Sequence, residues 1–344
     1  MVLAVSPAQG STFGGTAITI TGANFGAAPS VLVGGVAATA VTVKDASTIT
    51  ATTVAHPTGP VDIVVTAVEG RSGTLPNGYT YMVPSIENTP PVIQSMLAIG
   101  TRSGEPAEYA NVNESLNITA SVTDNETPVS ELTFEWSADL GSFSGTGSHV
   151  VWTAPRSTGA VTLRVKVIER YIGADSSGLP VSRENTVDGS ATVSVHDEGT
   201  EVAGMAKDFL VLFSQSSVGV DAVLHDFEDG CPGKSAERDD TVKNRQNYRI
   251  LSYFVGAPRV SVDFNGVSPF RSRRADAWAS VDVEWLSSCL KQDPTLGCPA
   301  IGATRRDRGV DWVTARYDTP TKRWWLCDSD YEPSASTSLT RYLR

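Results

Sequence analysis

The stretch EVAGMAKDFLVLFSQSS, residues 201–217, contains the first strongly helical pattern in the chain. Its apolar side chains recur at intervals of three and four, as at Val202, Met205 and Phe209, so an amphipathic helix is expected there. The sequence before it is rich in Val, Thr, Ser and Gly and has no cysteine, whereas all four cysteines and five of the seven tryptophans follow it. Position 200 therefore separates a β-only part from a part of mixed structure.

The residues downstream predict an α+β domain. Two shorter helices are expected at 222–227 and 236–248, with Ser235 as a candidate N-cap of the second. Apolar residues then alternate with a period of two, which is typical of β-strands, over residues 259–264, 275–286, 310–317 and 323–329. Helices followed by such strands predict three helices packed on a curled antiparallel sheet.

The residues before position 200 predict short β-strands separated by turns rich in Gly, Pro and Asn. Residues 16–21, TAITIT, alternate strictly, and the pair Gly34-Gly35 accepts the positive φ angles of a tight hairpin. Residues 115–123 and 161–167 alternate in the same way. Turns that recur about every 8 to 12 residues predict immunoglobulin-like β-sandwiches, two of them in series. The expected domains are therefore residues 1–83, 84–199 and 200–344.

The net charge of −11 is unevenly distributed along the chain. Residues 83–199 contain 6 basic and 15 acidic side chains, so most of the negative charge lies in the middle domain. A surface of this sign repels phosphate groups, and nucleic acid is therefore excluded as an expected partner. The acidic residues have two interpretations, a solubilising surface or a calcium site.

The four cysteines all lie in the last domain: Cys231, Cys289, Cys298 and Cys327. Cys289 and Cys298 flank a short turn-like segment, so one local and one long-range disulfide are expected. Zinc is the competing interpretation, but the chain has no C-x-x-C spacing and His225 is the only histidine of this domain. Disulfides form in oxidising compartments, which predicts an extracellular or cell-surface protein.

Two membrane-related features are missing from the sequence. No stretch approaches the roughly 20 apolar residues that a transmembrane helix requires. Met1 is followed directly by apolar residues, without the basic segment that begins a secretory signal. We therefore expect no transmembrane segment, and an N-terminus that starts an expressed or processed mature segment.

The N-terminal domain contains a series of glycine-rich turns. Residues 6–11, SPAQGS, are followed by GGT at 14–16 and GANFG at 22–26, and the domain closes with GYTY at 78–81. This series resembles TIG (IPT) immunoglobulin-like domains over the whole segment. The resemblance implies a module without catalytic residues. In bacteria such modules are spacers in surface proteins or companions of carbohydrate-active enzymes, so both a spacer role and glycan binding stay open.

A second resemblance covers the middle domain. Its segments NITA at 117–120 and FEWS at 134–137, with Asp124-Asn125-Glu126 between them, resemble the PKD and cadherin-like branch of immunoglobulin-like folds. Oxygen ligands of this kind suit Ca²⁺, and calcium is the one candidate cofactor. An Asp-Asn-Glu turn also exists without a metal, so a solvated turn is the alternative.

The last domain ends in two aromatic segments, WVTARY at 312–317 and KRWWLCD at 322–328. Together with helices that precede strands, these segments resemble nuclear transport factor 2-like (SnoaL-like) domains, which implies a cone-shaped α+β fold with an internal pocket. Concavities lined by tryptophan suit sugars and apolar ligands, whereas core packing is the competing role. The candidate ligand-binding residues are Trp312, Trp324, Trp325 and Tyr248.

Some members of this fold are enzymes that use Asp with His or Tyr. The candidate residues of these types are Asp226, Asp263, Asp282, His225 and Tyr248. None lies in a motif that requires catalysis, so no catalytic residue is assigned.

These observations predict a secreted or surface-displayed bacterial protein with a structural or adhesive function, as in an extracellular fibre or surface assembly. Its expected partners are other copies of itself or other surface proteins. Two basic loops, at residues 271–274 and 305–308, are candidates to dock on the acidic middle domain of another copy. The first alternative is an extracellular polysaccharide-binding protein, and the second is a SnoaL-like enzyme in residues 200–344.

Overall fold

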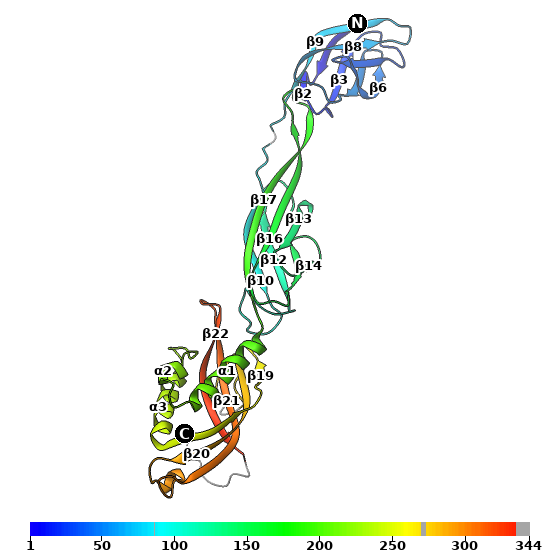
Figure 1. Cartoon of the computed structure of the whole chain (residues 1–344). Coiled ribbons are helices and arrows are strands. Elements are labelled where there is room, and N and C mark those ends of the chain that lie inside the picture. Colours follow the sequence, from blue (N-terminus) through cyan, green and yellow to red (C-terminus); the bar gives the residue numbers. More distant parts are fainter. Residues whose placement is uncertain (86, 270–272, 335–344) are drawn as a thin grey trace. The chain divides into compact units, whose positions relative to one another are not determined.

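The computed structural model describes residues 1–85, 87–269 and 273–334 (Figure 1). The chain divides into two compact units. The first comprises Met1–Ile93, Val122–Phe134 and Lys166–Asp188. The second comprises Gln94–Ser121, Glu135–Val165 and Gly189–Arg344.

The N-terminal domain, in the first unit, is a sandwich of two sheets with strand orders β1-β3-β7-β6 and β2-β9-β8-β4-β5. Pairing within them is antiparallel except between β2 and β9. The strands are β1 (Val2–Ser6), β2 (Gln9–Ser11), β3 (Ala17–Gly22), β4 (Ser30–Val33), β5 (Val36–Ala37), β6 (Thr39–Asp45), β7 (Thr48–Thr52), β8 (Gly59–Thr66) and β9 (Ser72–Met82).

The alternating sequence explains how these two sheets pack. In β3 the two isoleucines, Ile18 and Ile20, are buried in a core shared with Tyr79 of the other sheet. The predicted hairpin joins β4 to β5, where Gly34 and Gly35 have φ angles of 62° and 81°. Glycine adopts such angles without strain, so the Gly34-Gly35 pair favours this tight turn.

The middle domain is also a sandwich, with strand orders β10-β12-β15-β14 and β11-β17-β16-β13. Its core, which includes Trp152 and Leu163, belongs to the second unit. The strands are β10 (Val92–Ile99), β11 (Tyr109–Asn111), β12 (Ser115–Thr123), β13 (Thr133–Ala138), β14 (Ser142–Ser144), β15 (His149–Thr153), β16 (Gly159–Ala174) and β17 (Pro180–His196), with a short 3₁₀ helix, η1, at Val129–Glu131.

The C-terminal domain has three helices and a five-stranded antiparallel sheet of order β18-β20-β21-β22, in which β19 also pairs with β20. Helix α1 packs against β18, β19, β20 and β22, and α3 packs against β18 and β22. The elements are α1 (Glu198–Ser214), α2 (Val220–Val223), α3 (Pro232–Asn247), β18 (Tyr248–Val255), β19 (Arg259–Val262), β20 (Ala277–Cys289), the 3₁₀ helix η2 (Pro294–Leu296), β21 (Thr304–Asp318) and β22 (Arg323–Pro333).

The helix boundaries differ from those expected. Helix α1 begins three residues early because Asp197, not a later residue, caps it by accepting a hydrogen bond from the amide of Thr200 at 3.1 Å. Helix α3 begins at Pro232, a residue favoured in the first turn, so Ser235 lies inside the helix and is not its cap. Strand β18 was not expected at all, because its exposed Leu251 and Phe254 break the alternation of apolar and polar residues.

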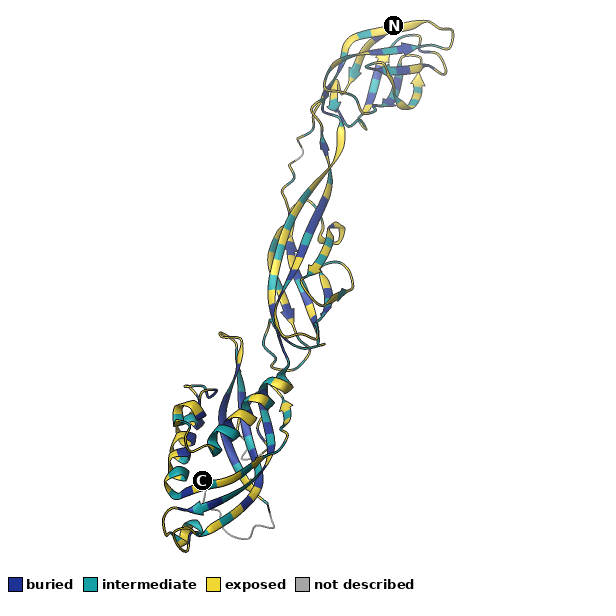
Figure 2. Ribbon diagram, viewed as in Figure 1, coloured by how far each residue is buried: buried dark blue, intermediate teal, exposed yellow. Residues whose placement is uncertain are grey.

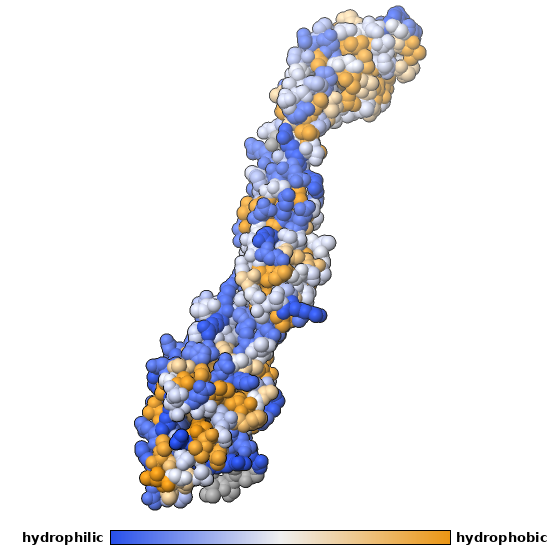
Figure 3. All heavy atoms as spheres, in the orientation of Figure 1, coloured by the Kyte–Doolittle hydropathy of each residue, from blue (hydrophilic) through white to orange (hydrophobic). Residues whose placement is uncertain are grey.

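One face of the C-terminal sheet forms the core with the helices. In β20, Ala277, Ala279, Val281 and Val283 are all buried, and the residues between them are more exposed (Figure 2). This is the period of two expected for a strand with one covered face. Hydrophobic and hydrophilic side chains are mixed over the visible surface of this domain (Figure 3).

A set of aromatic side chains joins the middle sandwich to the C-terminal domain inside the second unit. We call it the junction cluster: Tyr109, His196, Phe264, Tyr317 and Trp324. The ring of Tyr109 stacks on His196 at 5.0 Å and meets the edges of Tyr317 at 4.7 Å and Trp324 at 6.3 Å. Tyr109 is fully buried and belongs to the core of the C-terminal domain.

Candidate ligand pocket

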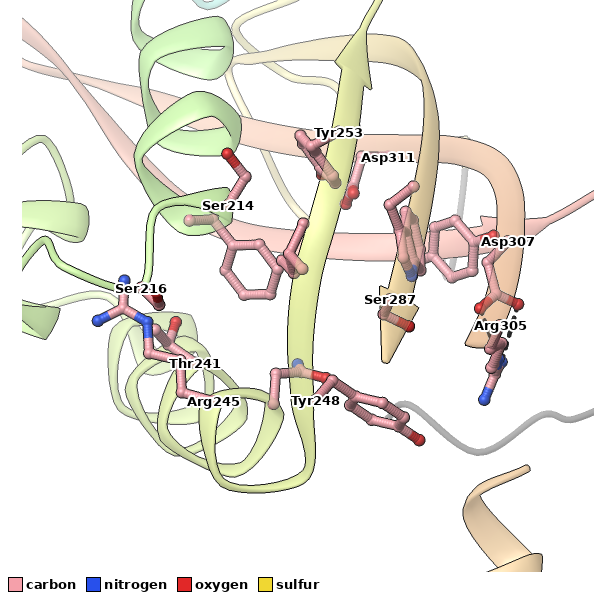
Figure 4. A pocket seen from close by; sticks show the side chains of 15 residues that line it. Ser214, Ser216, Thr241, Arg245, Tyr248, Tyr253, Ser287, Arg305, Asp307 and Asp311 are labelled. Carbon is pink, nitrogen blue, oxygen red and sulfur yellow. Dashed lines mark hydrogen bonds and ion pairs between the residues drawn. The ribbon is translucent and has the colours of Figure 1, made fainter. Parts of the chain in front are cut away.

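The C-terminal domain contains a cavity of about 70 Å³ between helices α1 and α3 and the covered face of the sheet (Figure 4). Such a volume holds roughly five to seven water molecules. The residues that line it are Phe213, Ser214, Ser216, Thr241, Asn244, Arg245, Tyr248, Ile250, Tyr253, Trp285, Ser287, Arg305, Asp307, Asp311 and Tyr331.

Strand register brings the sheet side of this pocket together. Trp285 of β20 lies opposite Tyr253 of β18 and Asp307 of β21, and Asp311 lies opposite Tyr331 of β22. A register shift between Ile250 and Ser252 adds one residue to β18. Because of this bulge, Ile250 and Tyr253 both line the pocket although they are three positions apart.

We call the five aromatic residues of the lining the pocket cluster: Phe213, Tyr248, Tyr253, Trp285 and Tyr331. Trp285 is its centre, with ring centroids 5.9 Å from Tyr253 and 4.7 Å from Tyr331. The side chains of Trp285, Tyr253 and Tyr331 are only partly buried. Aromatic faces that are left open in this way can stack on a ligand.

Two buried aspartates, Asp307 and Asp311, lie on the sheet side of the pocket. Arg305 holds Asp307 through two nitrogens, at 2.8 Å and 2.5 Å, and donates a third hydrogen bond to the carbonyl of Leu296 at 2.9 Å. Burial alone would lower the pKa of Arg305, but the hydrogen bond and charge of Asp307 outweigh it and raise that pKa. The guanidinium of Arg305 therefore stays charged.

The hydroxyl of Tyr331 is buried without a hydrogen-bond partner among the described residues. Burial, followed by the charges of Asp307 and Asp311, raises the pKa of Tyr331 above its ordinary value. The hydroxyl therefore keeps its proton and is available as a donor. On the helix side, the Nε of Arg245 is likewise buried without a partner in the described part of the chain, while its terminal nitrogens donate to the carbonyls of Val218 and Gln215.

The disulfides are Cys231–Cys327 and Cys289–Cys298, the long-range and the local pair that the spacing suggested. Cys289 and Cys298 of the second disulfide pack with Tyr248, one of the residues that line the pocket. The hydroxyl of Tyr248 donates to the carbonyl of Leu296 at 2.7 Å.

Of the four candidate ligand-binding residues, only Tyr248 lines the pocket. Trp324 is 1% exposed and belongs to the junction cluster. Trp325, its neighbour on the other face of β22, lies against the guanidinium of Arg323, 4.2 Å from its ring centroid. The indole N–H of Trp312 donates to Glu332 at 3.0 Å, and its side chain alternates with that of Asp311 along β21.

Sequence reasoning missed four aromatic residues of the pocket and both of its aspartates. A signal was present in β21. Asp307 and Asp311 are separated from the apolar Val313 and Ala315 by even numbers of residues, so all four side chains belong to the same face of the strand. Acidic residues on an otherwise apolar strand face mark a place where the core is interrupted. No sequence signal of this kind distinguishes Trp285 from a core tryptophan, because the helices next to it, α1 and α3, come from distant parts of the sequence.

The candidate catalytic residues lie elsewhere, apart from Tyr248. Asp226 accepts from Arg323 at 2.8 Å and lies 3.1 Å from His225. Asp282 is exposed and pairs with Arg259 at 2.9 Å, and Asp263 accepts from the amide of Asn265 in an exposed turn. Each carboxylate has a structural partner outside the pocket.

The calcium candidates form a turn in the first unit. Asp124 accepts from the amides of Glu126 at 2.9 Å and Thr127 at 2.6 Å, and Glu126 accepts from the amide and hydroxyl of Thr89. Asn125 is exposed in this turn. Within the described residues, the only three His, Cys, Asp or Glu side chains whose ligand atoms converge are Glu228, Cys231 and Cys327, whose cysteines are bonded to each other.

The arginines of the two basic segments are largely paired within the domain, and the second segment lies in strand β21 and not in a loop. Arg273 contacts Asp328 and Asp330, Arg305 binds Asp307, and Arg306 lies 3.5 Å from Glu284. Arg271 lies outside the described residues. None of the helices that the structure describes is long and apolar enough to cross a membrane.

Several solved structures resemble parts of this chain at low sequence identity. The extracellular region of plexin A4 is 17% identical over 46% of this chain and 13% of that one, with a TM-score of 0.22. A protein of the mixed-linkage glucan utilization locus of Bacteroides ovatus, bound to a mixed-linkage heptasaccharide, is 18% identical in sequence. The match covers 53% of this chain and 41% of that one, with a TM-score of 0.18. The D0-D1 domain of intimin is 15% identical over 54% of this chain and 97% of that one, with a TM-score of 0.19.

The chain spans less than half the length of the first two of these structures, and at such TM-scores none of the three carries an argument about function. No curated protein matches the sequence. Residues 1–81 match the family model of the IPT/TIG domain. The N-terminal domain of this chain is thus an IPT/TIG domain, as its glycine-rich turns predicted.

Proposed function

We propose that this chain is an extracellular adhesive protein that binds a saccharide in the pocket of its C-terminal domain. The observation that supports this best is the pocket cluster, whose partly open rings around Trp285 face buried polar groups. Sugars present an apolar ring face and a rim of hydroxyls, and this combination suits aromatic platforms beside fixed donors and acceptors.

In this proposal the IPT/TIG domain and the middle sandwich are spacers that carry the C-terminal domain and its pocket. In the IPT/TIG domain and the middle sandwich, the large aromatic side chains of Tyr79, Tyr81 and Trp152 are buried in the cores. The two disulfides support an oxidising, extracellular location. We also retain, as proposals, a PKD or cadherin-like assignment for residues 84–199 and a nuclear transport factor 2-like assignment for residues 200–344, which is supported by three helices on one face of an antiparallel sheet.

The proposal is tested by titrating the full chain with soluble oligosaccharides and by pull-down on insoluble polysaccharides. Trp285→Ala removes the central platform and is expected to weaken binding about 10- to 100-fold, the effect of losing a central aromatic contact. Trp325→Ala is the matched control, because Trp325 lies outside the pocket. Binding that survives Trp285→Ala but is lost in Trp325→Ala would place the site at Trp325, a candidate that the sequence alone suggested.

We propose binding without catalysis, because both pocket aspartates already have protein partners: Arg305 for Asp307 and the hydroxyl of Ser329 for Asp311, at 2.9 Å. A catalytic acid or base must lie within hydrogen-bond reach of the proton that it exchanges, and these partners already occupy oxygens of both carboxylates. Incubation of the full chain with each bound oligosaccharide, followed by product analysis, checks this. Product formation that Asp311→Asn abolishes would establish the enzyme alternative.

The structural alternative, self-assembly into a fibre with other copies, makes no use of the pocket. Light scattering of the full chain distinguishes the two, since assembly that is unchanged in Trp285→Ala supports the structural function.

Calcium also remains a proposal for Asp124, Asn125 and Glu126. An ion that binds only the folded state raises the unfolding temperature, so an effect of Ca²⁺ that Glu126→Gln removes would support that site.

A further inference from the structure

Arg245, on the helix side of the pocket, carries a positive charge that no carboxylate balances within the described residues. Its terminal nitrogens donate to two neutral acceptors, the carbonyls of Val218 at 2.5 Å and Gln215 at 3.0 Å. Burial is the only cause of the shift in its pKa, which is lowered, and no carboxylate opposes that shift. The guanidinium stays protonated even so, because its pKa starts far above neutral pH. The pocket lining therefore includes an unpaired cation.

Two neutral polar side chains lie next to this guanidinium. The two carbonyls that it holds come before and after Ser216, so Ser216 lies beside Arg245, as Figure 4 shows. Asn244 precedes Arg245 in α3 and also lines the pocket. In the part of the chain that the structure describes, the hydroxyl of Ser216 and the side-chain amide of Asn244 have no hydrogen-bond partner. The helix side of the pocket therefore has one positive charge and two further groups that can donate.

The carboxylates on the sheet side are held by other groups. Asp307 is bound by Arg305 through two nitrogens. Asp311 accepts from the hydroxyl of Ser329 at 2.9 Å. Both aspartates lie in β21, and Figure 4 shows them on the strands, whereas Arg245 extends from the helix. An anionic group of a ligand is therefore favoured at Arg245 and not beside the aspartates.

We propose that the pocket recognises a sugar unit that carries a carboxylate, a uronic acid. This inference rests on the proposed saccharide-binding function and narrows it. The carboxylate accepts from the guanidinium of Arg245, with Ser216 and Asn244 as further donors, and the sugar ring lies against an aromatic ring of the pocket cluster. The planar guanidinium matches the two oxygens of a carboxylate, and such charge-assisted hydrogen bonds are roughly twice as strong as neutral ones.

Calorimetric titration of the full chain with matched ligands tests the inference: oligomers of galacturonic acid and of mannuronic acid, and the methyl esters of both. Esterification removes the negative charge and keeps the sugar. At least one of the two acids is expected to bind about tenfold or more tightly than its own ester. Oligoaspartate is the control for negative charge alone. Because the chain has a net charge of −11, which repels anions, oligoaspartate is expected not to bind.

Four variants connect the binding to the pocket. Arg245→Gln removes the charge and should abolish the preference for the acid over the ester, whereas Arg245→Lys keeps the charge and should retain most of it. Arg238→Gln is the matched control, because it removes a charge from the same helix that pairs with Asp221 outside the pocket. Asn244→Ala removes only a side chain without a described partner, so it tests the site even if Arg245→Gln misfolds; it should weaken binding of the acid about twofold to tenfold. Circular dichroism and unfolding temperature establish that each variant is folded.

The outcomes separate this inference from the proposed function. Equal binding of acid and ester, or binding of neutral oligosaccharides alone, with loss in Trp285→Ala, overturns the carboxylate preference and leaves saccharide binding intact. A preference for the acid that oligoaspartate matches, or that Arg245→Gln and Asn244→Ala leave unchanged, overturns the assignment to Arg245. Absence of binding by every saccharide overturns both the inference and the proposed function.

Discussion

The second unit contains two clusters of five ring-bearing residues with opposite properties. In the junction cluster Tyr109 and Trp324 are almost completely buried, and the hydroxyl of Tyr109 donates to Glu198 at 3.0 Å. In the pocket cluster Trp285 and Tyr331 are partly exposed, and the hydroxyl of Tyr331 has no described partner. Similar side chains therefore fill space in one place and leave it open in the other.

Both clusters have paired buried charges beside them. Beside the junction cluster, Arg102 binds Glu198 through both carboxylate oxygens at 2.9 Å and also reaches Glu105 and Glu114. Burial tends to lower the pKa of Arg102, but the bonds and charges of Glu105 and Glu198 outweigh it and raise the pKa. The junction pairs its buried charges with one another, but it also contains buried polar atoms without a described partner, the Nε of Arg102 and the indole N–H of Trp324. The pocket has the same feature at Tyr331 and Arg245. The exposure of the rings, more than the satisfaction of polar atoms, therefore separates core from site.

Removal of the two disulfides is expected to have the largest effect on stability. Cys289–Cys298 packs with Tyr248 of the pocket cluster, and Cys327 follows Trp324 of the junction cluster by three residues in β22. Cys231–Cys327 closes a separation of 96 residues, and Cys289–Cys298 closes one of 9. Chain entropy predicts a loss of about 4.7 kcal/mol for the long loop and about 2.7 kcal/mol for the short one. Urea unfolding of the two paired Cys→Ser variants measures both. Equal losses would show that loop length does not determine the stabilisation.

Truncation of the junction tyrosine is expected to cost slightly less. Tyr109→Ala leaves a cavity in a core shared by two domains and should destabilise the full chain by about 3–5 kcal/mol. Phe254→Ala is the matched control, because Phe254 is 62% exposed and its loss should change stability by no more than about 0.5 kcal/mol. A loss below about 1 kcal/mol in Tyr109→Ala would mean that the two domains do not depend on this contact.

A pair of conservative variants compares the two clusters directly. Tyr109→Phe removes a hydrogen bond to the charged Glu198 and should destabilise by about 1.5–3 kcal/mol. Tyr331→Phe removes a buried hydroxyl without a described partner, so it should be neutral or stabilise by up to about 1 kcal/mol. Thermal and urea unfolding of both variants check the signs. Destabilisation by Tyr331→Phe would indicate that a water or ligand already bonds to that hydroxyl.

The smallest expected effect is a pH dependence of the junction cluster. Burial raises the pKa of Tyr317 to about 12 from its ordinary value of 10.0. Between these values the unfolded tyrosine loses its proton while the folded one keeps it, so stability falls as pH rises. Tyr317→Phe should make this decline shallower in urea unfolding between about pH 10 and 12, whereas Tyr171→Phe in the first unit should leave it unchanged. The same slope in all three proteins would contradict the prediction.

Sequence reasoning succeeded where local pattern decides structure. The alternation around Ile18 and Ile20 and the Gly34-Gly35 turn predicted the N-terminal sandwich, and the turns of residues 6–26 predicted its family. It placed α1 to within three residues but missed β18, because the outer side of that strand exposes Leu251 and Phe254. Hydrophobic periodicity cannot recognise a strand whose exposed face is also apolar.

The sequence by itself determined the change from strands to helices near residue 200, the IPT/TIG domain, and which residues of each strand share a face. Only the tertiary structure decided that Trp324 is core and Trp285 is pocket. Both lie on the covered face of one sheet, and local periodicity fixes the face of a strand but not what lies above it. That depends on where α1, α3 and Tyr109, all from distant sequence, close over the sheet and where they leave it open.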